Sequence, residues 1–124
     1  MAPDPALTEA SWRLLATVGI GRVALSCGAL PVVLVVRCEV DEGRLLLHSN
    51  DPSLTRAAHA GDVVAFQVDD VSSEGAGSSV VVTGFLAPER DRVVSLSPTL
   101  ATRTELSLGP PVRGSRVRGP RVAS

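Results

Sequence analysis

The residues best suited to chemistry lie between His48 and Arg56, in the segment HSNDPSLTR. An apolar run ends at His48 and a helical pattern begins at about Ser53, so a strand gives way to a helix here. The first backbone N–H groups of a helix are unpaired and attract anions. Ser49, Ser53 and Thr55 add hydroxyl donors, and Arg56 adds a guanidinium suited to phosphate oxygens. The segment predicts a phosphate site; the alternative is that Ser53 only caps the helix and Arg56 is solvated.

A long apolar strand, expected from Pro31 to Val40, precedes this segment. Its residues from Val32 to Val36 are all apolar, so both faces of the strand must be covered. One cover is the core, and the other is a partner subunit, a flat heterocycle, or both. Arg37 ends the run on the side nearest the following turn. The alternative for Arg37 is a strand-end ion pair with Glu39 or Asp41, which contributes little if exposed.

The elements that must position these residues suggest a small β barrel. One helix is expected over 8–18, ended by Gly19, and a second over 53–60, opened by Asp51 or Ser53 and ended by Gly61. A hairpin turn at 41–43 and a polar loop over 69–77 separate strands. The expected strands cover 21–26, 31–40, 44–48, 62–68, 78–86 and 92–96, with a continuation over 100–106. Short hairpin-linked strands with two helices favour a closed or nearly closed antiparallel barrel.

The composition of the 124 residues, 44% hydrophobic and 20% charged, indicates one globular domain. Aromatic residues are scarce, so Val, Leu and Ala must build the core, and we expect an uncovered apolar face that favours dimerisation. The net charge of -1 gives no reason to expect nucleic acid or a membrane as partner. No run approaches the roughly 20 apolar residues of a membrane span, and no signal peptide is visible, so a cytoplasmic location is expected.

Other features carry weaker signals. Cys27 and Cys38 are expected to be buried thiols, and His48 and His59 lack metal-ligand spacing, so no metal site is expected. Residues 109–124 are rich in Gly, Pro and Arg and predict a disordered tail. An RNA or acidic surface as the partner of that tail is the alternative.

Several of these runs resemble one family when taken together. LPVVLVVRCEVDEGRLLLHS and SLTRAA, followed by VVAFQVDD and SSVVVTG, resemble the pyridoxamine 5'-phosphate oxidase-like flavoproteins, and their short actinobacterial members most closely. The resemblance covers residues 10 to 105 and implies a mainly β fold, the six-stranded antiparallel FMN-binding split barrel, over 1–108. That fold has one N-terminal helix and one short helix after the third strand. The resemblance also implies a homodimer that binds FMN at its interface and a flavin-dependent oxidoreductase of unknown substrate. The alternatives are F420 as cofactor, or a non-catalytic flavin-binding or cofactor-free barrel.

The resemblance also implies which residues bind the cofactor. The strand matching Val32–Arg37 runs along the isoalloxazine ring, the strand-end pair contributes to the phosphate and ribityl site, and the helix start clamps the phosphate. One further position comes from the facing subunit. The matching residues are Leu34, Val35, Val36 and Arg37 on the strand, His48 and Ser49 at the strand end, Ser53, Thr55 and Arg56 in the clamp, and Ser79 from the facing subunit. No side chain is assigned a catalytic role, because the cofactor performs the chemistry.

The chain departs from the family pattern in three places. Arg56 stands where Lys is common, and Ser78 or Ser79 stands where relatives often carry Trp. The run RDRVVSLSPT follows VVVTGFLAPE almost at once, where relatives usually insert a helix. This shortening removes material that often helps to cover the substrate side.

Overall fold

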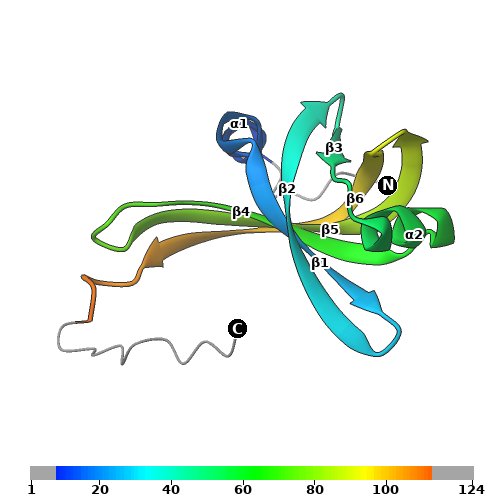
Figure 1. Cartoon of the computed structure of the whole chain (residues 1–124). Helices are drawn as coiled ribbons and strands as arrows, with labels where there is room; N and C mark the ends of the chain where they lie inside the picture. The colour runs from blue at the N-terminus through cyan, green and yellow to red at the C-terminus, as the bar shows by residue number, and fades with distance from the viewer. Residues whose placement is uncertain (1–7, 113–124) are drawn as a thin grey trace.

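The computed structural model describes residues 8–112, whose strands close into one antiparallel barrel (Figure 1). Around the barrel the strands follow the order β1–β2–β3–β6–β5–β4. The strands are β1 (Ile20–Cys27), β2 (Leu30–Asp41), β3 (Arg44–His48), β4 (Val63–Val71), β5 (Ala76–Arg90) and β6 (Val93–Ser107). The helices are α1 (Glu9–Val18) and α2 (Pro52–Ala60), the second of which follows β3. The predicted fold class is therefore confirmed.

Both helices begin and end at capping residues. Thr8 caps α1 by accepting a hydrogen bond from the Ser11 N–H, and Gly19 ends it with a left-handed φ of 70°. Asp51, rather than Ser53, caps α2, and Pro52 occupies its first turn. Gly61 ends α2 with a φ of 68°. Of the two capping residues considered for the second helix, only Asp51 is used.

The last three strands are longer than predicted. Asp69 to Val71 belong to β4 and pair with Ser79 to Gly77 of β5, so the predicted loop over 69–77 is wrong at both ends. The sixth strand is unbroken, because a bulge opposite Thr83 and Gly84 lets it continue past Pro98. Outward positions of a strand tolerate polar residues, so polar composition did not mark the ends of these strands.

The core lies inside the barrel and beneath the two helices. Val23, Phe66 and Leu45 are fully buried within it. Leu15 of α1 is fully buried, and α2 buries one face made of Leu54, Ala57 and Ala58. The buried face of α2 fixes which of its residues point outward, and these include Thr55 and Arg56.

The barrel is split along one edge of β2. Leu30 to Arg37 pair with β1, whereas β3 pairs only with Arg37 to Asp41. Figure 1 shows the β1–β2 hairpin extending away from the other strands. Within residues 8–112, the edge of β2 from Leu30 to Val36 that faces away from β1 has no strand partner. Backbone groups along this edge are available to a ligand.

Two predictions concern regions at the limits of the described chain. Residues 109–112 form no helix or strand, and the remainder of the predicted tail, 113–124, lies outside the described residues. Neither of the two helices described is long and apolar enough to cross a membrane.

Candidate functional site

The outer face of β2 presents apolar side chains to solvent. Val33 is 61% exposed and Val35 is 67% exposed, whereas Val36 is buried and Leu34 packs partly into the core. Arg37 points outward with Val35. Leu34 and Val36 can therefore offer a surface ligand only their backbone groups, while Val35 and Arg37 can offer side chains.

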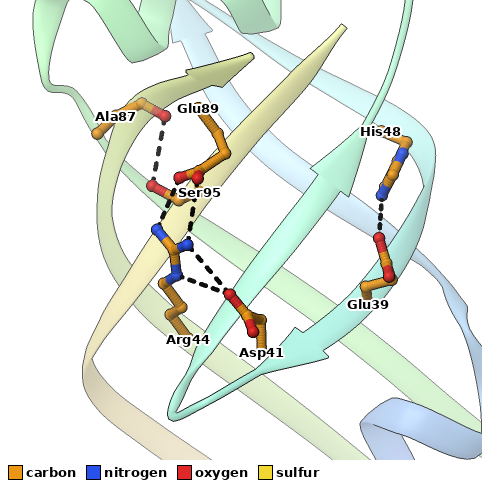
Figure 2. Close-up of polar contacts among 7 residues, drawn as sticks. All are labelled: Glu39, Asp41, Arg44, His48, Ala87, Glu89 and Ser95. Atoms are coloured by element: carbon orange, nitrogen blue, oxygen red, sulfur yellow. Dashed lines mark hydrogen bonds and ion pairs between the residues drawn. The ribbon is translucent and has the colours of Figure 1, made fainter. Parts of the chain in front are cut away.

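Arg37 has no carboxylate partner within residues 8–112, because both candidates bind elsewhere. The Glu39 carboxylate lies 2.7 Å from His48 Nε2, and Asp41 accepts a hydrogen bond of 3.0 Å from Arg44 Nη2 (Figure 2). The strand-end ion pair considered for Arg37 is therefore absent. Its guanidinium lines a hollow of about 410 Å³ with residues from the end of β3 and the β5–β6 turn, namely His48, Ser49, Asn50, Asp91, Arg92 and Val93.

The start of α2 already holds a carboxylate. Asp51 Oδ1 accepts a 2.8 Å hydrogen bond from the Ser53 N–H, and Ser49 Oγ accepts one of 3.0 Å from the Asp51 N–H. The Asp51 carboxylate thus occupies the positive end of the helix dipole, which lowers the attraction of the bare helix end for a second anion. Anion binding here must depend on side chains, chiefly those of Thr55 and Arg56.

A larger hollow, of about 920 Å³, lies between α2 and the turn that joins β5 to β6. It brings together three of the predicted residues, Ser49, Thr55 and Arg56, and adjoins the Arg37 hollow, with which it shares several residues. Ser53 does not line it. The full lining is Ser49, Asn50, Pro52, Thr55, Arg56, Ala58, His59, Pro88, Glu89, Arg90, Asp91, Arg92, Val93 and Val94.

Arg90, the last residue of β5, and Arg92, in the turn that follows, are the part of this site that sequence reasoning missed. They belong to an ordinary polar strand end and turn, and no motif marks them. The only available sequence signal was the short connection itself, since the charged run RDR follows VVVTGFLAPE directly. Arg56 of α2 lines the same hollow, and its Nη2 donates a long hydrogen bond of 3.8 Å to Cys27 Sγ at the end of β1.

Ser79 lies apart from the other predicted residues. It is buried on β5, where its hydroxyl accepts a 3.0 Å hydrogen bond from Gln67 Nε2. Leu86, seven residues further along β5, hydrogen-bonds to Asp62 just after α2. Seven strand residues span roughly 23 Å. Within one chain, Ser79 and Arg56 therefore cannot contact the same small group.

The ionisable groups around the site differ in their environments. Burial raises the pKa of the Cys38 thiol to about 12, and the Glu39 carboxylate adds to this effect. Hydrogen bonds to Glu89 and Asp41 raise the pKa of Arg44, so this cation stays charged. Within residues 8–112, no three His, Cys, Asp or Glu side chains come together as a metal site.

Comparison with known proteins identifies the family. The family model described as pyridoxamine 5'-phosphate oxidase matches residues 8–96, so the chain belongs to this family. An uncharacterized protein of Mycobacterium tuberculosis, Rv0080, is 35% identical over 89 residues, which are 67% of this chain and 59% of that protein. The chain thus spans less than two thirds of this relative's length.

Solved structures share the fold. The FAD binding protein from Mycobacterium smegmatis superposes with a TM-score of 0.67 at 23% identity, over 80% of this chain and 96% of its own. An FAD-binding protein from Mesorhizobium loti superposes with a TM-score of 0.66 at 18% identity, over 79% and 92% of the two chains. These likenesses establish the split barrel that the resemblance implied.

Proposed function

We propose that this protein binds FMN at the interface of a homodimer and acts as a flavin-dependent oxidoreductase. The observation that carries the proposal is the outer face of β2. Exposed Val33 and Val35 offer an apolar surface to a flat ring, and the unpaired edge beside them offers backbone donors and acceptors to the ring's polar atoms. The same strand leads to Arg37 and to the hollow that contains Arg56.

The apolar outer face supports the proposed dimer. Strand register places Val33, Ala24, Ala65, Thr83 and Leu100 side by side across five strands. Val33 and Leu100 are 61% and 54% exposed, so this row has no adequate cover within residues 8–112. A second copy would cover the row. It would also bring its Ser79 toward the first copy's cofactor site, whose Arg56 Ser79 cannot approach within one chain.

The residues of the chain would bind and orient the cofactor rather than react themselves. A bound flavin supplies hydride transfer through its ring. Arg37, which has no carboxylate partner in the described chain, would attract an anionic substrate or stabilise negative charge on the ring. Arg56, Thr55 and Ser49 would bind the phosphate.

The test is a titration of the full-length protein with FMN and with riboflavin, which lacks the phosphate, followed by flavin fluorescence. We expect Arg56→Ala to weaken FMN binding roughly 10- to 100-fold, as for the loss of one or two charge-assisted hydrogen bonds. Riboflavin binding should change little. Arg13→Ala is the matched control, because Arg13 is an exposed arginine of α1 that pairs only with Glu9.

Two results would contradict the proposal at different points. Equal FMN affinity in Arg56→Ala and wild type would show that Arg56 does not bind the phosphate. Failure of the wild type to bind any flavin nucleotide would show that the protein does not use a flavin cofactor. Binding of F420 in place of FMN would instead establish a deazaflavin protein of the same fold.

A further inference from the structure

The turn between β5 and β6 contains an arginine in a conformation that favours glycine. Arg90 pairs with Val93, and Arg92 at the tip of the turn has a φ of 62°, in the left-handed region. Other hairpin turns of this chain place Gly28 and Gly43 at such positions, although Glu42, beside Gly43, also has a positive φ of 47°. A left-handed backbone costs free energy for any residue with a Cβ. This conformation fixes Arg92 at the turn, where it lines the hollow.

One contact holds this turn beside the end of β3, and a second joins the preceding part of β5 to the start of β3. The Ser49 N–H donates a 3.1 Å hydrogen bond to the Arg92 carbonyl. Arg44 Nη1 donates one of 2.7 Å to Glu89 Oε1, and Arg44 Nη2 one of 3.2 Å to Glu89 Oε2 (Figure 2). The turn is therefore fixed beside Ser49, one of the residues of the proposed phosphate site.

These contacts leave the hollow with an excess of positive charge. The hollow is lined by three arginines and two carboxylates, and one of these carboxylates, Glu89, pairs with Arg44, which also pairs with Asp41. Asp91 lies 3.7 Å from Arg92 Nε, too far for a hydrogen bond. Arg90 has no ion pair within residues 8–112, and neither does Arg56 on the opposite wall. Arginines from α2 and from the β5–β6 hairpin thus line the same hollow.

We propose that Arg90 and Arg92 form the second wall of the phosphate site and bind the phosphate group of a flavin nucleotide opposite Arg56. This inference rests on the proposed function. Because the Asp51 carboxylate caps α2, the helix end offers little to an anion, and the turn supplies the missing positive charge. The phosphate monoester of FMN and the diphosphate of FAD present the same oxygen chemistry to these arginines.

The decisive variant is Arg92→Gly, because it separates a binding role from a structural one. Glycine removes the guanidinium and also the backbone strain. We expect the dissociation constant for FMN to rise about tenfold or more while riboflavin binding is unchanged. The thermal midpoint should stay the same or rise. Arg90→Ser should weaken FMN binding in the same selective way, and Arg13→Ser is the control.

Titration with FAD beside FMN identifies the source of the phosphate. A larger loss for FAD than for FMN would indicate that the turn binds the diphosphate, and a loss no larger for FAD would indicate the monoester; both support the inference. Unchanged affinity for both nucleotides, or an equal loss for riboflavin, would overturn it while leaving flavin binding intact. A wild type that binds no flavin would overturn the proposed function as well.

Discussion

Arginines without ion pairs gather around one side of this molecule. Within residues 8–112, the arginines with no ion pair are Arg22, Arg37, Arg56 and Arg90. Arg37, Arg56 and Arg90 line the two adjoining hollows, and Arg22 lies beside Val35 on the outer face. Their charge is therefore available to an anionic ligand rather than to internal ion pairs.

At the residue scale, the two thiols should differ in reactivity. Cys38 is buried with a pKa raised to about 12, whereas Cys27 is only half-buried. Because the thiolate is the reactive form, iodoacetamide at pH 8 should modify Cys27 and leave Cys38 unmodified until the protein unfolds. Peptide mass spectrometry of native and unfolded samples measures this. Equal labelling of both thiols in the native protein would contradict the burial of Cys38.

The same pKa predicts a loss of stability at high pH. Above pH 9 the unfolded chain releases the Cys38 proton, while the folded chain retains it up to about pH 12. The contribution of Cys38 to folding is therefore complete below pH 9 and falls as pH rises through this window. Denaturant unfolding of wild type and Cys38→Ala at pH 8 and pH 10 should show a steeper fall for the wild type. Equal falls would contradict the assignment.

At the element scale, β1 passes β4 too closely for a side chain at one position. A Cβ on Gly21 would lie 2.5 Å from the Phe66 ring and 2.5 Å from the Gln67 carbonyl oxygen. We expect Gly21→Ala to destabilise the fold by about 1–3 kcal/mol or more, measured by denaturant unfolding. Ala24→Ser, exposed on the same strand, is the control. A stability equal to wild type would show that the strands separate more easily than this contact indicates.

The ion pair between Arg44 of β3 and Glu89 of β5 should also affect ligand binding. Arg44→Gln leaves the Glu89 carboxylate unneutralised in the hollow, so FMN affinity should fall roughly two- to fivefold. The double variant Arg44→Gln with Glu89→Gln should recover most of this loss. If the double variant binds FMN no better than Arg44→Gln, the effect does not arise from the Glu89 charge.

Local signals made much of this architecture predictable. The strand Arg44–His48 matches its prediction, and the hairpin turn lies within the predicted 41–43, because apolar periodicity and turn residues are both local features. The extent of β4 past Asp69 was not predictable in this way, since its pairing with Ser79 depends on residues distant in sequence. Arg90 and Arg92 were missed for the same reason: only the closed barrel brings their turn against α2.

At the scale of the whole molecule, the uncovered outer face should control assembly. Val35→Glu places a charge on the outer face of β2, where Val35 is 67% exposed, and should convert the proposed dimer into a monomer. Leu108→Glu is the matched control, because Leu108 is 69% exposed but lies beyond the end of β6. Analytical ultracentrifugation measures both variants. A dimeric Val35→Glu protein, or a monomeric wild type, would contradict the proposed interface.

The central claim is that this barrel holds a flavin nucleotide against β2. Its most direct test is the visible absorption spectrum of the purified 124-residue protein, with mass spectrometry of any released cofactor and titration of the protein with FMN if none is released. We predict the two-banded spectrum of a flavin and the mass of FMN, or the appearance of tightly bound FMN on titration. A colourless protein that takes up neither FMN, FAD nor F420 would contradict the claim and leave a barrel without a cofactor.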